Sequence, residues 1–278
     1  MNFSSYRNQI TLDNKRLSYI DIGEGPVLLF GHSYLWDSQM WAPQLAHLSQ
    51  HYRCIVPDLW GHGNSDPIPD STRSLQHIAD QMLTLMDTLK IETFSVIGLS
   101  VGGMWGAELA LKAPTRVTTL VMMGCFIGFE PEVSRTKYYN MLDIIKASKG
   151  VPAPLIEQIA PLFFAKNAAQ NTPELFAHFK QSLAELNPEL VETLFRLGKI
   201  IFGRRDAMEE VEKLTLPCLI MTGVEDSVRP VLEGYLMHDA IDGSEYIHIP
   251  NAGHISSLEQ PQFINEQLTN FLNKHLKS

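Results

Sequence analysis

The sequence lacks the features of a secreted, disulfide-bonded or membrane-spanning protein. Its 278 residues include only three cysteines, Cys54, Cys125 and Cys218, at wide and unpatterned spacing. This excludes a disulfide framework or a zinc ribbon and indicates reduced thiols in a cytoplasmic protein. The longest apolar stretch, residues 117–129, is interrupted by two threonines and is too short to cross a membrane. The first residues contain no apolar signal segment, so secretion is not expected.

Positive charge is also scarce. Lys and Arg total 22 against 31 Asp and Glu, which gives a net charge of −9 without any block of one sign. This distribution argues against a surface for nucleic acid or anionic lipid. The metal-binding patterns H-x-H-x-D-H and H-E-x-x-H are absent, as are a phosphate-binding G-x-x-x-x-G-K-[ST] and a G-x-G-x-x-G after the first strands. We therefore expect no metal, no cofactor, no nucleic acid and no membrane partner.

Short apolar runs alternate with longer segments of helical periodicity. The runs are residues 17–22, 27–30, 54–56, 94–97, 120–123, 219–221 and 246–249, and the clearest helical segments are 75–89, 101–111 and 263–272. This alternation predicts an α/β protein with a doubly wound, mainly parallel sheet. From about Glu130 to about Lys213 the pattern becomes helical and rich in proline. We interpret that stretch as a helical insertion over the carboxyl edge of the sheet, where open α/β sheets bind ligands.

A G-x-S-x-G sequence follows the run 94–97 and leads directly into a helical segment. It reads Gly98-Leu99-Ser100-Val101-Gly102. A serine on a sharp strand-to-helix turn needs small neighbours, and the following helix N-terminus favours developing negative charge. The pattern alone is weak, but the strand before it and the helix after it are the required context. Ser100 is therefore the candidate nucleophile.

A serine hydroxyl needs a base, usually histidine, and that histidine needs an acid to orient it. Five histidines follow Ser100. His178 falls in the insertion, His275 in the terminal helix, His238 in a helical segment and His248 within a strand. His254 lies in the loop after the last strand, at the edge where catalytic groups collect, and we predict it to be the base.

The acid is expected in the loop after the buried strand at residues 218–222. Glu225 and Asp226 are adjacent there, and one backbone conformation directs only one of them at His254. Asp226 is the preferred acid because its short side chain, three places after Gly223, returns over the sheet edge. The predicted oxyanion hole is formed by the N–H of Val101 and the N–H of Tyr34.

The chain resembles the α/β-hydrolase superfamily, and the resemblance runs from about residue 10 to about residue 272. The motifs that carry it are Gly31-His32-Ser33-Tyr34 with Trp41 further on, Pro57-Asp58-Leu59-Trp60-Gly61-His62-Gly63-Asn64-Ser65-Asp66, the Ser100 turn, Gly223-Val224-Glu225-Asp226, and Asn251-Ala252-Gly253-His254 followed by Glu259-Gln260-Pro261. The resemblance implies an eight-stranded sheet, a core of residues 1–129 and 214–278, and a helical cap of residues 130–213. It also implies Ser100, Asp226 and His254 as a triad, and a structural role for the 61–66 loop.

Within the superfamily, the chain is most similar to 3-oxoadipate enol-lactonase-like and carboxylesterase-like members. The implied reaction is hydrolysis of a small or medium carboxylic ester or lactone through an acyl-enzyme. The alternatives on the same triad are C–C bond hydrolysis and perhydrolase or haloperoxidase chemistry, or a homologue that only binds its ligand. A lactone that bears a carboxylate would need a basic residue, for which the sequence offers Arg135, Lys137, Arg204 and Arg205.

The substrate is expected to be a small molecule held by apolar walls. The candidate wall residues are Tyr34, Trp36, Phe126, Phe163 and Phe164. The oligomeric state is not predicted.

Overall fold

A computed structural model describes residues 3–276 of the chain. Eight strands form one sheet in the order β1-β2-β4-β3-β5-β6-β7-β8. The first two pairings, β1 with β2 and β2 with β4, are antiparallel, and the other five are parallel. The strands are β1 (Arg7–Leu12), β2 (Lys15–Ile22), β3 (Val27–Gly31), β4 (Arg53–Pro57), β5 (Phe94–Leu99), β6 (Val117–Met123), β7 (Cys218–Gly223) and β8 (Glu245–Ile249). The predicted fold class is confirmed.

Both faces of the sheet are buried by helices. On β3, Leu29 belongs to one apolar cluster and Leu28 and Phe30 belong to another, because successive side chains point to opposite faces. The first cluster includes the buried faces of α2 (Leu75–Thr88), α3 (Val101–Lys112) and α10 (Val231–Ala240), and the second includes those of α1 (Ala42–Leu48) and α12 (Pro261–His275). The central strands β5 and β7 thus carry continuous apolar runs, which made them recognisable in the sequence.

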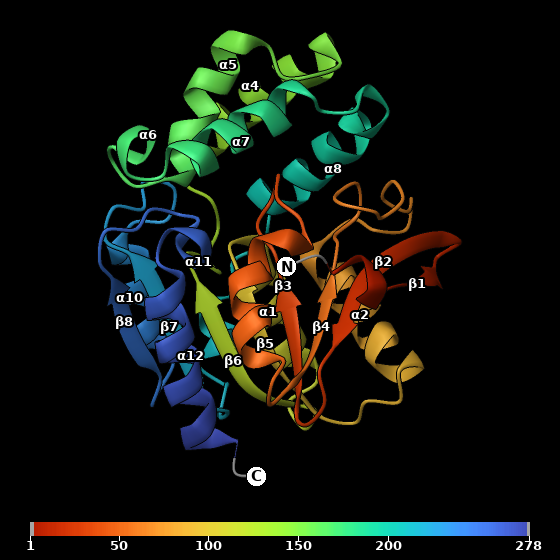
Figure 1. Cartoon of the computed structure of the whole chain (residues 1–278), viewed down its shortest axis with the longest axis vertical. Coiled ribbons are helices and arrows are strands. Elements are labelled where there is room, and N and C mark those ends of the chain that lie inside the picture. Colours follow the sequence, from red (N-terminus) through yellow and green to blue (C-terminus); the bar gives the residue numbers. More distant parts are fainter. Residues whose placement is uncertain (1–2, 277–278) are drawn as a thin grey trace.

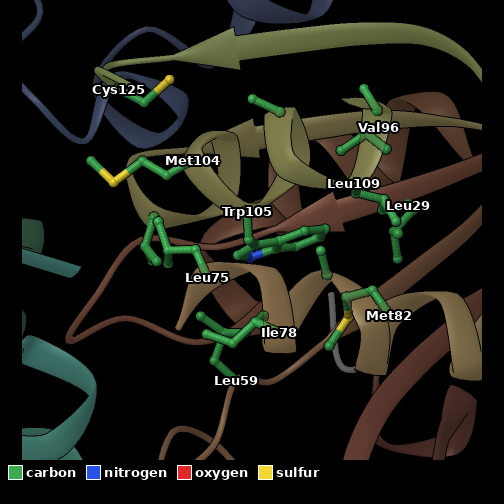
Figure 2. Close-up of a cluster of buried hydrophobic side chains, with 14 of the residues drawn as sticks. Leu29, Leu59, Leu75, Ile78, Met82, Val96, Met104, Trp105, Leu109 and Cys125 are labelled. Atoms are coloured by element: carbon green, nitrogen blue, oxygen red, sulfur yellow. The ribbon is translucent and has the colours of Figure 1, made fainter. Parts of the chain in front are cut away.

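Trp105 of α3 fixes that helix against the sheet. Its fully buried ring lies among Leu29 of β3, Val96 of β5 and Ile78 and Met82 of α2 (Figure 2). A ring of this size contributes much of the apolar area that a core helix buries. The start of α3, which carries the candidate nucleophile, is therefore held on a rigid layer.

The segment between β6 and β7 is helical. Figure 1 shows α4 to α8 above the end of the sheet toward which the parallel strands run. These helices are α4 (Glu132–Ser148), α5 (Ala153–Ile159), α6 (Ala168–Asn171), α7 (Pro173–Ala184) and α8 (Val191–Phe202). We call this set the cap. The next helix, α9 (Met208–Val211), contacts α3 and α10 of the core.

Proline sets the beginnings of several cap elements. Pro154, Pro161, Pro173 and Pro188 each stand in the first turn of a helix, where the missing N–H costs nothing. They begin α5, the 3₁₀ turn η3 (Ala160–Phe163), α7 and the 3₁₀ turn η4 (Pro188–Leu190). The prolines that suggested an interrupted segment thus divide the cap into short helices.

The remaining elements are short or terminal. They are the 3₁₀ turns η1 (Ser4–Tyr6) and η2 (Ser38–Trp41) and the helix α11 (Ser256–Glu259). Within residues 3–276 no helix combines the length and the apolar character that a membrane crossing needs.

Candidate active site

Ser100 stands on a sharp turn between β5 and α3. Its φ is 57° and its ψ is −121°, a conformation that residues other than glycine rarely adopt. A Cβ on Gly98 would overlap the backbone of Gly102, and a Cβ on Gly102 would overlap the backbone of Gly31. The two glycines are therefore required by space, as the G-x-S-x-G pattern indicated. The turn is closed by a hydrogen bond of 2.8 Å from the N–H of Ser100 to the carbonyl of Met123.

Asp226 and His254 are in direct contact. Nδ1 of His254 lies 2.8 Å from Oδ2 of Asp226, and both side chains are almost completely buried. The other carboxylate oxygen of Asp226 accepts the N–H groups of Val228 and Arg229, each at 2.9 Å. These bonds fix the carboxylate that faces Nδ1 of the imidazole.

The neighbouring carboxylate, Glu225, has a different partner. Its Oε2 accepts the N–H of Lys166 in the cap at 2.8 Å. Glu259 makes a similar link, because its two oxygens accept the N–H of Gly253 and the N–H of Ala165, both at 2.8 Å. Two carboxylates thus connect the loops of the sheet edge to one cap segment. Sequence reasoning assigned neither role, since the cap backbone could not be placed.

Ser100 lies at the same edge as this pair. The backbone N–H of Ser100 donates to the carbonyl of Met123. The residue after Met123, Gly124, lies against the side chains of Asp226 and His254. A Cβ on Gly124 would stand 3.1 Å from Oδ2 of Asp226 and 3.3 Å from Nδ1 of His254. The structure therefore brings the three predicted residues to one place on the carboxyl edge, and their roles are developed below as a proposal.

The loop after β3 carries the predicted oxyanion donor at Tyr34. Gly31 at the end of β3 pairs with Gly98 at the end of β5, so this loop and the Ser100 turn leave the sheet side by side. Within residues 3–276 the N–H groups of Tyr34 and Val101 have no hydrogen-bond partner in the protein. Two such donors on adjacent loops can hold a developing oxyanion.

Two buried histidines hold this loop in place. Nε2 of His62 accepts the N–H of Leu35 at 3.0 Å, and Nε2 of His32 accepts the N–H of Leu59 at 2.8 Å. Leu35 adopts a positive φ of 66°, and its N–H donates to His62, which supports this conformation. Burial lowers the pKa of His62 to about 3, so this ring is neutral and remains an acceptor. Both histidines are structural here.

An apolar cavity of about 70 Å³ lies between the cap and this edge. Tyr34 of the oxyanion loop, Val228 of the acid loop and Phe163 of the cap all line it. The Phe163 ring meets the His254 ring edge-on, with centroids 5.6 Å apart. The cavity is thus lined by residues of the loop after β3 and of the Asp226 loop, and its wall residue Phe163 contacts His254.

The five predicted wall residues lie in different parts of the structure. Tyr34 and Phe163 line the cavity, whereas Trp36 lines an open groove of about 600 Å³ on the cap–core boundary and stacks on Phe179. Phe164 packs edge-on against Phe176, and Phe126 offers its carbonyl to Nε of Arg204. These last three are not among the residues that line the cavity.

A buried cluster of charges joins the cap to the acid loop. Glu130 lies just before α4 and Arg204 just after α8, and they pair at 2.9 Å. The same Glu130 oxygen also pairs with Arg229, three residues after Asp226. All three side chains are 2% exposed. Glu130 therefore connects both ends of the cap to the backbone that fixes the acid.

The comparisons with known proteins agree with this architecture. The family model described as alpha/beta hydrolase fold matches residues 26–153. Over 97% of its length the chain superposes on an esterase from Thermogutta terrifontis, with a TM-score of 0.86, 26% identity and 99% of that chain covered. The chain has the α/β-hydrolase fold.

Enol-lactonases are similar to this chain in sequence and in structure. A 3-oxoadipate enol-lactonase of Acinetobacter baylyi is 23% identical over 262 residues, which is 94% of each protein. The enol-lactonase of Burkholderia xenovorans superposes with a TM-score of 0.85 and 25% identity, over 96% of this chain and 100% of that one. The resemblance stated from the sequence motifs is confirmed. Together these likenesses support a hydrolase that acts on ester bonds.

Proposed function

We propose that this protein is a serine hydrolase that cleaves a small carboxylic ester or lactone through an acyl-enzyme. The observation that supports this most is the buried contact of 2.8 Å between Asp226 and His254 beside the strained turn of Ser100. A strained serine, an oriented imidazole and two free N–H groups on one sheet edge are the parts that acyl transfer needs.

In the first step, Oγ of Ser100 attacks the carbonyl carbon while Nε2 of His254 accepts the hydroxyl proton. The carbonyl π electrons move to oxygen, and the N–H groups of Tyr34 and Val101 hold the resulting oxyanion. Asp226 stabilises the imidazolium that forms. When the tetrahedral intermediate collapses, the C–O bond to the leaving group breaks and His254 gives its proton to the departing alkoxide.

The second step returns the enzyme to its starting state. Water attacks the acyl carbon and loses a proton to His254, and the ester bond to Ser100 breaks as that proton returns to Oγ. The products are a carboxylic acid and an alcohol, which for a lactone are parts of one molecule. Side chains, the two backbone N–H groups and water supply every group that these steps need.

Hydrolysis of p-nitrophenyl butyrate and of a five-membered lactone tests the proposal. We expect turnover of both by the wild-type protein, and a loss of about 10⁴-fold in kcat for Ser100→Ala. Ser257→Ala is the matched control, because it also removes a buried hydroxyl but one that has no hydrogen-bond partner and no proposed role. Equal activity of Ser100→Ala and wild type would overturn the proposal.

The alternative reactions give different outcomes in the same assay. A C–C bond hydrolase would act on a vinylogous 1,5-diketone far better than on either ester. A perhydrolase would form peracid from hydrogen peroxide and a carboxylic acid at a rate above its hydrolysis of the ester. A protein that only binds its ligand would give no turnover above the Ser100→Ala background.

A further inference from the structure

The apolar cavity beside the site has no cationic side chain in its lining within residues 3–276. Its polar side chains are Tyr34 and Tyr138, and its other lining residues are Leu, Ile, Met, Phe and Val. The Tyr34 hydroxyl is committed, since it donates to the carbonyl of Leu194 at 2.7 Å. The Tyr138 ring stacks on Phe202 with centroids 4.3 Å apart. Burial raises the pKa of both phenols, so neither carries charge near neutral pH.

The four cations that the sequence offered to a carboxylate all lie elsewhere. Arg204 is buried against Glu130 at 2.9 Å, and Arg205 pairs with Glu108 at 2.8 Å. Arg135 lies near Glu132 on the exposed side of α4, and Lys137 lines a separate depression on the cap surface. Not one of the four is among the residues that line the cavity.

Arg229 directly follows Val228 of the cavity wall. Its side chain is 2% exposed and pairs with both Glu130 and Glu233. Two carboxylates therefore already compensate its charge, and the Glu130 oxygen is shared with Arg204. An anion in the cavity would meet a charge cluster that is already balanced.

The cavity is also small. A single buried water needs roughly 10–15 Å³ measured in this way, so about 70 Å³ suits a chain of a few carbon atoms. An apolar chain there gains from leaving water, whereas an unpaired carboxylate loses its hydration without compensation.

We propose that the enzyme selects a short, neutral acyl group and rejects an acyl group that bears a carboxylate. This inference rests on the proposed ester or lactone hydrolysis and names the substrate class of that site. It separates the chain from relatives named for 3-oxoadipate enol-lactone, since a dicarboxylate that closes one lactone keeps a second, free carboxylate. Overall likeness to those proteins therefore does not extend to their substrate.

Two matched esters test the selection. p-Nitrophenyl butyrate and mono-p-nitrophenyl succinate share the leaving group and the chain length, and they differ in a terminal methyl against a carboxylate. We expect kcat/KM to be at least ~100-fold higher for the butyrate. A ratio below about 10 with both esters cleaved would overturn the selectivity and leave the hydrolase intact. Loss of both activities would overturn the proposed function and this inference with it.

A second test of the selection places a positive charge at the cavity wall. Met141 of α4 lines both the cavity and the surface depression that contains Lys137, and it is only partly buried, so a longer polar side chain is accommodated. Met141→Lys is expected to raise the ratio of kcat/KM for the succinate ester to kcat/KM for the butyrate ester at least ~10-fold relative to wild type. The neutral control Met141→Gln is expected to keep this ratio within about 3-fold of the wild-type value. An equal change in this ratio for Met141→Lys and Met141→Gln would overturn the electrostatic basis of the selection.

Discussion

Oδ2 of Asp226 lies 2.8 Å from Nδ1 of His254, whereas the carboxylate of the preceding residue, Glu225, accepts the N–H of Lys166 in the cap. Two adjacent acidic residues thus have different hydrogen-bond partners. One fixes the imidazole inside the sheet edge, and the other fastens the cap to the loop.

This difference predicts unequal effects of two isosteric substitutions. Asp226→Asn removes the charge that orients His254, and we expect kcat to fall by about 10³- to 10⁴-fold. Glu225→Gln keeps an acceptor for Lys166, and we expect less than a 3-fold change in kcat. Steady-state kinetics on p-nitrophenyl butyrate measures both. The reverse ranking would make Glu225 the acid.

Phe163 and Phe164 are adjacent in sequence, but only Phe163 lines the cavity. Phe163→Ala enlarges that space, so we expect the best acyl chain to lengthen by about two to four carbons while acetate ester turnover changes little. Phe164→Ala leaves the cavity wall intact and is expected to keep the wild-type chain-length profile. The profile is measured with p-nitrophenyl esters from acetate to octanoate. A longer optimum in the Phe164 variant, or an unchanged one in the Phe163 variant, would remove Phe163 from the acyl site.

His62 makes stability depend on pH. Its ordinary pKa of 6.5 falls to about 3 through burial, so between these values the unfolded chain binds a proton that the folded chain does not. Stability therefore decreases as the pH falls from about 6.5 toward 3, and protonation also removes the acceptor of the Leu35 N–H. From pH 7 to pH 5 the wild type is expected to lose about 2 kcal/mol more than His62→Gln in urea unfolding. Parallel losses in the two proteins would exclude His62 as the cause.

The Glu130 cluster predicts a large effect on folding. Glu130→Gln leaves Arg204 and Arg229 buried with reduced compensation, and we expect the free energy of unfolding to fall by about 3–5 kcal/mol. Glu132→Gln is the control, since its side chain is 84% exposed and 3.8 Å from Arg135, and it is expected to change stability by less than about 0.5 kcal/mol. Urea denaturation at pH 7 measures both. Equal stability of the two variants would show that the cluster does not join the cap to the core.

Most of the strands that sequence patterns located are buried on both faces, and the exception is the edge strand β8, in which only Ile249 is buried. Residues 94–97 and 219–221, for example, lie inside β5 and β7, where every residue is buried. The strand that the patterns did not indicate is β1, whose sequence RNQITL buries only Leu12. An edge strand of this kind pairs through its backbone and needs no apolar run, so its side chains carry little signal.

Local motifs also located the candidate site, because the Ser100 turn, the acid loop and the His254 loop each follow a strand of one parallel sheet. Contacts between the cap and the core were beyond the same reasoning. Glu130 and Arg229 are 99 residues apart, and no local pattern indicates that they pair. Likewise, Phe163 and Phe164 look equivalent in the sequence, and only the packing of the cap decides which of them lines the cavity.

Labelling with a serine-directed fluorophosphonate tests the central claim most directly. Wild-type protein treated with the reagent, digested and mapped by mass spectrometry is expected to carry one adduct, on Ser100, with loss of ester turnover in proportion to labelling. Ser100→Ala is expected to remain unlabelled and folded. An adduct on any other residue, or an unlabelled protein that still hydrolyses p-nitrophenyl butyrate, would contradict the account.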